Sequence, residues 1–393
     1  MPVTTLSHFV GTALTSKITY NFGIRFQNCK AVAVTGPRQS GKTTLVRKVF
    51  PDKPYSNLEN PDIRKFAVED PRGFLAHYRE GAILDEVQRA PELFSYLQQI
   101  LDESPTTGLF ILTGSNNFLI QESISQSLAG RVGYLYILPL SLNETDIENS
   151  DQMMLMGGYP VLHQGSIETS RFFANYIRTY VERDVRLLKN ITDLFLFERF
   201  IRLCAGRTGQ LLNMNNLSTE VGVNNKTIGS WIGVLETSFI VFRLQPYHRN
   251  FNKRIVKTPK LYFYDTGLAV ALLGIENVKQ LSLSPYRGSL FENLVIVEFL
   301  KKRYNKGKSP NLFFWRDNTG NEIDLVMESG NLIHPVEIKS GKTVSEEFFR
   351  NLRFWKKLTG MNVGTIIYDG DLHQERSEGI RLIPVRDMHT ISI

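Results

Sequence analysis

Over the first 145 residues, short apolar runs alternate with segments in which apolar residues recur at helical spacing. The runs predict strands over 31–35, 53–58, 81–86, 109–113 and 134–138. The segments between them predict helices over 45–50, 61–79 and 91–102, with a break at Pro71. Strands that alternate with helices in this way indicate a parallel sheet. Residues 1–30 have a short, mixed periodicity and predict at most a helix beside this core.

The first predicted strand ends in a glycine loop that a helix follows. The order of strand, Gly-x-x-x-x-Gly-Lys-Thr and helix is that of a phosphate-binding P-loop. Its glycines allow the backbone to approach phosphates, and the loop amides and helix N-terminus favour an anion. We expect Lys42 to reach the β- and γ-phosphates and Thr43 to hold Mg²⁺. The residues predicted to bind ATP are Gly36, Pro37, Arg38, Gln39, Ser40, Gly41, Lys42, Thr43 and Thr44.

The predicted strand over 81–86 ends in two acids, Asp85 and Glu86. Ligands of open α/β sheets lie at the carboxyl ends of the strands, so both acids are expected near the P-loop. Asp85 is predicted to hold Mg²⁺, and Glu86 to orient or deprotonate an attacking water. Taken alone, the pair is also typical of a solvated strand end. Beside a P-loop, the second acid favours a hydrolase over a small-molecule kinase.

Two further polar positions follow predicted strands. In P-loop ATPases the strand corresponding to 109–113 lies between the P-loop strand and the acid-bearing strand, so its polar end faces the γ-phosphate. Ser115 or Asn116 is therefore the candidate sensor of that phosphate. Arg131 is either an arginine finger, acting in its own subunit or on a neighbour in a homo-oligomer, or an ordinary surface ion pair.

Composition limits the class of protein. The chain has 393 residues, enough for about two to four domains, and its 42% hydrophobic and 22% charged residues are those of a soluble globular protein. A net charge of +7 permits a polyanionic partner without requiring one. Cys29 and Cys204 are too isolated for a disulfide framework or a zinc site. No apolar run reaches the roughly 18 residues of a membrane span, and residues 1–20 lack a secretory signal. We therefore expect a cytoplasmic protein with no membrane partner.

Four segments together resemble the AAA-superfamily ATPases of bacteria and archaea that carry a C-terminal domain of unknown role. These segments are Gly36–Thr44, Leu84–Pro91, Thr113–Asn116 and Leu128–Arg131. The later segments that match the same family are Tyr180–Val185, Arg207–Leu212 and Leu261–Leu268. This resemblance implies an ATPase core with appended helical, winged-helix and nuclease-like parts. It implies no settled cellular function.

The middle of the chain is predominantly helical in pattern. Helices are predicted over 172–188 and 194–204, after an interruption at 157–160, and suggest a lid over the nucleotide. Charges alternate between 182 and 186, as is usual for a solvated helix face, although one arginine there can serve the ATP site.

Residues 216–235 resemble a helix-turn-helix, with Gly222 at a turn that needs a left-handed residue. A strand over 238–244 then suggests a winged helix. Winged helices contact either DNA or protein, so both remain open. The residues of the second helix that can reach phosphates or base edges are Asn224, Asn225, Lys226, Thr227 and Ser230.

The segment 247–260 is basic and contains no acid. Its composition suits a phosphate backbone and stacked bases, and equally a solvated basic loop. Its cations and aromatic residues are Arg249, Lys253, Arg254, Lys257, Lys260, Tyr247 and Phe251.

The C-terminal region predicts a helix over 291–304, strands over 311–316, 322–328 and 333–339, and a helix over 345–359. Glu337 and Lys339 are two positions apart and share one face of a strand, and Asp324 lies on the neighbouring hairpin strand. Two carboxylates and a lysine suit Mg²⁺-assisted phosphodiester hydrolysis, with Asp324 and Glu337 as metal ligands.

Asp324, Glu337 and Lys339 resemble the signature of the PD-(D/E)XK nuclease superfamily, and Glu292 matches its helical acid. Ile323 stands where that signature usually has proline. Alternatively, the fold persists as a binding domain and the acids are merely polar strand residues.

Taken together, the sequence predicts a multidomain α/β protein with four parts. These are a P-loop ATPase core with a parallel sheet (1–145), a helical lid (146–205), a winged helix-turn-helix (206–265) and an α/β nuclease-like domain (266–393). The favoured function is an ATPase that acts on nucleic acid, with DNA preferred, and that cleaves it with Mg²⁺. The alternative is a nucleotide-dependent switch whose C-terminal parts only bind protein.

Overall fold

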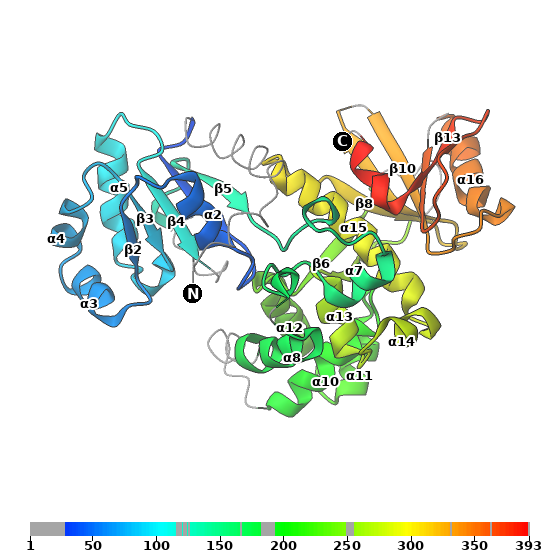
Figure 1. Cartoon of the computed structure of the whole chain (residues 1–393), viewed down its shortest axis with the longest axis horizontal. Helices are drawn as coiled ribbons and strands as arrows, with labels where there is room; N and C mark the ends of the chain where they lie inside the picture. The colour runs from blue at the N-terminus through cyan, green and yellow to red at the C-terminus, as the bar shows by residue number, and fades with distance from the viewer. Residues whose placement is uncertain are drawn as a thin grey trace. The chain divides into compact units, whose positions relative to one another are not determined.

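The computed structural model describes residues 28–114, 120, 124, 126–165, 167–181, 193–248, 255–330, 332–361 and 364–391. The chain forms two compact units (Figure 1). The first comprises Met1–Leu140, Thr237–Phe239 and Lys302–Lys308, and the second comprises Ser141–Glu236, Ile240–Lys301 and Ser309–Ile393. Within the described residues, no helix is both long and apolar enough to cross a membrane.

The first unit contains a five-stranded parallel sheet in the order β2-β3-β4-β1-β5. Its strands are β1 (Ala31–Thr35), β2 (Tyr55–Asn57), β3 (Ala82–Asp85), β4 (Phe110–Gly114) and β5 (Val132–Tyr136). The predicted parallel sheet is confirmed, and β4 lies between the P-loop strand and the acid-bearing strand as expected. Among the described residues, the helices that lie between these strands include α2 (Lys42–Val49), α3 (Pro61–Glu69), α4 (Pro71–Ala76) and α5 (Leu93–Glu103).

Both faces of this sheet are buried, which explains the uninterrupted apolar runs of its strands. On one face, Val32 and Ile83 pack with Val46 of α2. On the other, Ala33 packs in a core that includes Leu97 of α5. The predicted break at Pro71 is confirmed, because Asp70 ends α3 and its side chain caps α4.

The second unit begins with helices that pack around two glycines. Within the described residues, the helices from here onward are α7 (Ser150–Met156), α8 (Thr169–Tyr176), α10 (Leu194–Ala205), α11 (Met214–Val221), α12 (Asn225–Thr237), α13 (Thr266–Leu272), α14 (Val278–Leu283), α15 (Arg287–Asn305) and α16 (Arg350–Thr359). Short helical turns cover 142–144, 162–164, 177–181, 346–349 and 385–390. Asp265 caps α13 and accepts from the Gly158 amide, and a Cβ on Gly157 would lie 2.2 Å from the Asp265 carboxylate.

The predicted helix-turn-helix pair is present. Gly222 ends α11 in a left-handed conformation, and Leu217 and Ile228 are buried between the helices and their surroundings. Trp231 packs edge-on against Phe197 of α10, with ring centroids 5.3 Å apart. The two short helices are therefore part of a larger helical cluster.

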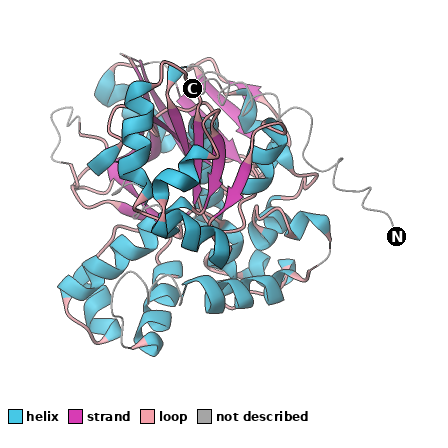
Figure 2. Ribbon diagram, turned by 90° about the vertical axis from the view of Figure 1, so that its left-hand side faces the viewer, coloured by secondary structure: helices cyan, strands magenta, loops and turns pink. Residues whose placement is uncertain are grey.

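The expected wing differs from an isolated hairpin. Strands β6 (Val241–Pro246) and β7 (Lys260–Phe263) form an antiparallel pair, and β6 then pairs in parallel with β8. The result is one eight-stranded sheet in the order β12-β13-β11-β10-β9-β8-β6-β7, whose strands are magenta in Figure 2. Its remaining strands are β8 (Leu312–Arg316), β9 (Glu322–Ser329), β10 (Leu332–Lys339), β11 (Gly364–Tyr368), β12 (Gln374–Glu375) and β13 (Ile380–Pro384).

This sheet crosses the expected boundary between 265 and 266, so the winged-helix and nuclease-like ranges share a core. Trp315 of β8 and Trp355 of α16 are fully buried and pack edge-on at 5.4 Å. The four-part division of the chain stays a prediction.

Candidate functional site

The glycine loop joins β1 to α2, and two of its positions favour glycine. A Cβ on Gly36 would lie 2.1 Å from the backbone oxygen of Ile137. Gly41 precedes α2 with φ 87°, a left-handed conformation that favours glycine. The two glycines of the motif are therefore required by close approach at one end and by backbone conformation at the other.

Lys42 lies buried in the loop, with 7% of its surface exposed. Its Nζ donates to the backbone oxygens of Gly36 at 3.0 Å and of Pro37 at 2.7 Å. Burial lowers the pKa of Lys42 from 10.5 to about 8, although Glu86 and Asp85 act in the opposite direction. The amine is thus held inside the loop by backbone oxygens of the loop itself.

The Asp85 carboxylate accepts hydrogen bonds from hydroxyl groups on three other elements. Thr43 of α2 donates to its Oδ2 at 3.0 Å, and Tyr55 of β2 donates to the same oxygen at 2.7 Å. Thr113 of β4 donates to Oδ1. The structure thus brings together the two residues predicted to hold Mg²⁺, Thr43 and Asp85. It adds Tyr55 and Thr113, which the sequence analysis did not assign.

Glu86 directly follows β3 in a left-handed conformation, with φ 55°. Gln88 donates from its Nε2 to Glu86 Oε2 at 2.5 Å. The amide oxygen of Gln88 is buried and has no partner among the described residues. Gln88 was not assigned from the sequence, because its contact with Glu86 depends on the short turn Val87–Arg89, which periodicity does not predict.

These residues fit a triphosphate and its cation. Ser40 Oγ is buried within the loop and has no partner among the described residues, as expected of a group that awaits a ligand. The loop residues from Gly36 to Thr44 would hold the phosphates, and Thr43 with Asp85 would hold Mg²⁺.

The other two predictions for this site have different outcomes. Arg131 forms a surface ion pair with Asp102, with Nε–Oδ1 at 2.6 Å and Nη2–Oδ2 at 2.9 Å. This is the second of its two predicted roles, and the arginine-finger role stays a prediction. Ser115 and Asn116 lie outside the described residues, as do the family-matching residues 182–185 and the basic residues Arg249, Lys253 and Arg254.

The C-terminal carboxylates lie on one face of the eight-stranded sheet. The antiparallel register that pairs Leu325 with Val336 places Asp324 beside Glu337. Lys339 donates to Glu337 Oε2 at 2.7 Å, and Asp324 Oδ2 accepts from the Ile338 amide at 2.8 Å. The structure therefore brings together the three residues that the sequence pattern selected.

Electrostatics at this cluster favour binding of a cation. Burial and the Glu337 and Glu292 carboxylates raise the pKa of Asp324 well above its usual range. Burial also raises the pKa of Glu337, and Lys339 opposes that shift. Glu337 Oε1 is buried and has no partner among the described residues. A divalent cation would relieve this crowding of negative charge.

Glu292 has a different environment from the other acids. It accepts from Lys260 Nζ at 2.9 Å and from the Tyr262 hydroxyl at 2.5 Å, both on β7. No group of three His, Cys, Asp or Glu side chains in the described part of the chain has an arrangement suited to a metal ion. Lys260 is buried, so it is not part of a solvated basic loop.

The P-loop ATPase class is defined by three features that are present here. They are a buried parallel strand, a Gly-Lys-Thr loop at its end, and an acid on β3, which lies two places from β1 in the sheet. In agreement with this geometry, residues 28–145 match the AAA domain family. The first unit therefore contains an AAA-type P-loop ATPase domain. Residues 147–279 and 287–388 match two domains of unknown function, DUF8612 and DUF4143.

Similar whole proteins extend over most of the chain. Uncharacterized proteins of Mycobacterium tuberculosis and Mycobacterium bovis are each 29% identical over 367 residues, which cover 91% of this chain and 81% of theirs. An uncharacterized protein of Haemophilus influenzae is 24% identical over 241 residues, 57% of this chain and 58% of its own.

Among solved structures, the Walker-type ATPase of Pyrococcus abyssi matches with a TM-score of 0.42 and 14% identity. That match covers 65% of this chain and 94% of the other. RuvB of Thermotoga maritima matches with a TM-score of 0.29 and 16% identity, over 60% of this chain and 90% of its own.

Proposed function

We propose that this protein is a Mg²⁺-dependent ATPase that acts on nucleic acid. The observation that carries the ATPase part is the hydrogen bond from Thr43 to Asp85 directly beside the buried Lys42. In this proposal Lys42 binds phosphate, and Thr43 and Asp85 hold Mg²⁺, at one end of the parallel sheet. Mg²⁺, when bound, neutralises charge on the phosphates.

Glu86 is the proposed general base. Its carboxylate follows Asp85 directly and is oriented by the Gln88 amide. In this role it positions a water in line with the γ-phosphate and accepts its proton. Lys42 leaves its backbone partners and places its charge against the phosphate oxygens. Asp85, which three hydroxyls orient, keeps a fixed carboxylate direction.

Phosphate release by the purified protein with ATP and Mg²⁺ tests this assignment. We expect Lys42→Ala to lose both nucleotide binding and turnover. Glu86→Gln should bind ATP yet turn it over at least about a hundredfold more slowly, because only proton acceptance is lost. Lys65→Ala, in an exposed ion pair with Glu69 on α3, is the control and should retain normal turnover. Normal turnover by Glu86→Gln would contradict the assignment.

The C-terminal cluster is the proposed site of action on nucleic acid, as a Mg²⁺-dependent nuclease. The specific observation in its favour is the buried, unpaired Glu337 Oε1 beside Asp324 and Lys339. In this role Asp324 and Glu337 hold Mg²⁺, and Lys339 stabilises the attacking hydroxide. Glu292 supports the charge balance from α15, where Lys260 and Tyr262 hold it.

Nicking of supercoiled plasmid in the presence of Mg²⁺ and ATP tests the nuclease. Lys339→Ala is expected to abolish nicking, because the hydroxide loses its cationic partner. Lys342→Ala, an exposed lysine three positions later, is the matched control and should nick normally. EDTA should stop cleavage by both the native protein and the control.

If the native protein does not nick and Lys339→Ala changes nothing, the alternative switch is favoured. In that function the helix pair α11–α12 and the eight-stranded sheet bind a partner protein in response to the nucleotide. The exposed Asn225 and Lys226 at the start of α12 are compatible with either kind of partner.

A further inference from the structure

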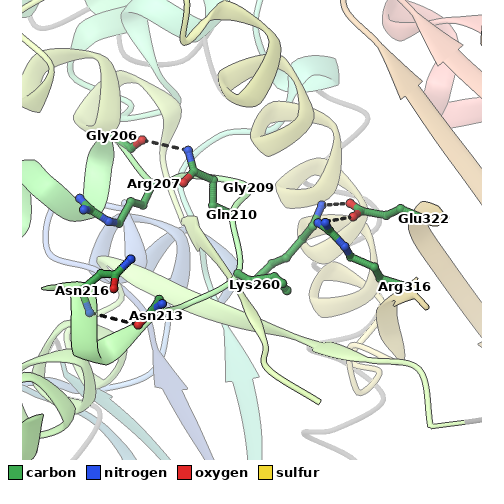
Figure 3. Close-up of a pocket in the computed structure, with 10 residues that line it drawn as sticks. Gly206, Arg207, Gly209, Gln210, Asn213, Asn216, Lys260, Arg316 and Glu322 are labelled. Carbon is green, nitrogen blue, oxygen red and sulfur yellow. Dashed lines mark hydrogen bonds and ion pairs between the residues drawn. The ribbon is translucent and has the colours of Figure 1, made fainter. Parts of the chain in front are cut away.

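A cavity of about 580 Å³ lies in the second unit, between the turn that follows α10 and the strands β7, β8 and β9 (Figure 3). This volume is in the range of about 300–1,000 Å³ in which small-ligand sites fall. The turn includes Arg207 and Gln210, from one of the segments that match the family and that the ATPase does not use. None of the residues that line the cavity belongs to the proposed ATPase site.

Backbone pairing fixes the turn over the edge of β7. The Gly209 amide donates to the Leu261 oxygen at 2.8 Å, and the Leu261 amide donates to the Gln210 oxygen at 3.1 Å. Gly209 has φ 77°, and a Cβ there would lie 3.4 Å from Glu292 Oε2. The turn thus passes closely over the acid of α15 that faces the C-terminal cluster.

The lining contains more cations than acids, although Arg207 is already paired with Glu220 outside the lining. Three cations line the cavity, namely Arg207, Lys260 and Arg316, and Glu322 is the acid among the described lining residues. Glu322 is shared, because Lys260 pairs with Oε1 and Arg316 Nη1 lies 3.0 Å from Oε2. Lys260 is only 3% exposed, so its charge is fixed at the wall rather than carried on a mobile surface side chain.

Neutral hydrogen-bonding groups complete the rim. The amides of Gln210, Asn213 and Asn216 line the cavity beside the cations, and no aromatic residue occurs in the described lining. Recognition here would therefore depend on charge and hydrogen bonds, not on ring stacking. Amide side chains pair with base edges and arginines with phosphate oxygens.

The same residues connect the cavity to the proposed nuclease cluster. Lys260 contacts both Glu322 of the cavity wall and Glu292 of α15, the acid that the sequence pattern groups with Asp324 and Glu337. Glu322 and Asp324 are two positions apart on β9 and share its face. A ligand in the cavity would therefore lie next to the carboxylates.

We propose that this cavity binds the phosphate and base of one nucleotide unit, with the phosphate on Arg316 and the base against the amide rim. The inference rests on the proposed action on nucleic acid and names the substrate class of that site. Two sources share this chemistry, a strand of DNA and a free nucleotide.

Binding measured without cleavage separates this inference from the nuclease. A labelled single-stranded oligodeoxynucleotide is titrated with the full chain in EDTA, and its fluorescence anisotropy gives Kd. Arg316→Gln should weaken binding about tenfold, because a charge-assisted hydrogen bond is lost. Arg353→Gln is the matched control, because the Arg353 side chain is 39% exposed against 38% for Arg316 and also pairs with a glutamate. Arg353 lies outside the cavity, so its substitution should change Kd by less than twofold.

Charge changes at one rim position control for effects on folding. Gln210→Glu should weaken oligonucleotide binding and Gln210→Lys should strengthen it, each by about threefold or more. Loss of stability would move both variants in the same direction. Thymidine 5′-monophosphate is the second probe. If it displaces the oligonucleotide only at high concentration, the ligand of the cavity is a DNA strand. If the monophosphate binds by itself and the Gln210 variants change its affinity, the ligand is a free nucleotide.

The inference is overturned if Arg316→Gln and Arg353→Gln bind alike, if the two Gln210 variants shift together, or if neither probe binds. It is also overturned if Lys226→Ala on α12 weakens binding while Arg316→Gln does not. Absence of nicking leaves the cavity assignment unaffected, because cleavage is not measured in EDTA. Loss of the cavity assignment leaves the ATPase unaffected in the same way.

Discussion

At the scale of single residues, opposing effects set the protonation state of Lys42 in the protein without nucleotide. Burial and Arg38 lower its pKa, while Glu86 and Asp85 raise it, and the result is about 8. The folded protein therefore holds this proton less tightly than the unfolded chain does. Between pH 8 and about 10.5 the contribution of Lys42 to stability rises with pH, because the unfolded chain binds more protons there.

Affinity for ATP has the opposite dependence. Only the charged amine attracts phosphate, so we expect affinity to fall about tenfold between pH 7 and pH 9 as Lys42 deprotonates. Calorimetry with a non-hydrolysable ATP analogue and Mg²⁺ measures this. Lys42→Arg keeps its charge over the range and should show little pH dependence, even if it binds more weakly. Equal slopes in the two proteins would place the titrating group elsewhere.

The part of the site that could be predicted is the part held within one stretch of sequence. The loop from Gly36 to Thr44 and the Asp85–Glu86 pair are each contiguous with a strand end, and the end of the apolar run shows where that end lies. Tyr55 and Thr113 could not be found in this way. Each lies on a different strand, and their hydroxyls meet Asp85 only because β2, β3 and β4 are neighbours in the sheet.

At the scale of elements, the two glycines of the helix-turn-helix have different effects on stability. Gly222 needs a left-handed conformation with φ 87°, and a Cβ there would meet nothing within 4 Å. Gly222→Ala should therefore cost about 1 kcal/mol through backbone strain alone. Gly229 lies inside α12 with only the Met214 sulfur near, at 3.9 Å. Gly229→Ala should stabilise by up to about 1 kcal/mol.

Urea denaturation monitored by circular dichroism compares these two variants. Opposite signs are expected, although both substitutions add the same methyl group. A loss of stability in both would mean that α12 packs more tightly than its open surroundings indicate.

The strands show the same limit of prediction as the site. The positions of β1 to β6 and of β8 to β10 were predicted within a few residues, because buried apolar runs end where polar residues begin. Strands β7, β11, β12 and β13 were not predicted. The partner of β6 was not predicted, since a strand's own sequence gives its period and not its neighbour. Gln245 and Pro246 pair with Phe313 and Phe314 of β8, more than sixty residues further along the chain.

At the scale of the whole molecule, ion pairs join distant segments of the second unit. Arg287 of α15 contacts Asp151 of α7 at 2.8 Å, Asp369 after β11 at 2.6 Å, and the Ser340 backbone oxygen after β10 at 2.7 Å. The Leu142 amide donates to Glu298 of α15 at 2.9 Å. These contacts connect segments that match separate families.

We expect the fragment 147–279 not to fold alone. Without the rest of the chain β6 loses its β8 neighbour, and the buried Lys260 loses both Glu292 and Glu322. An unpaired buried charge costs about 3–5 kcal/mol, a large share of a domain's stability. Near-ultraviolet circular dichroism with thermal unfolding measures this. A sharp, cooperative transition of the isolated fragment would contradict the prediction.

The pairing of β6 with β8 also bears on how such a chain can change over evolutionary time. A recombination event with its breakpoint between residues 279 and 287 would give the descendant β6 from one ancestor and its partner strand β8 from another. Only exchanges that carry β6 and β7 along with the C-terminal strands would preserve the pairing of β6 with β8. The two regions of unknown function are thus expected to be inherited together, whatever ATPase domain precedes them.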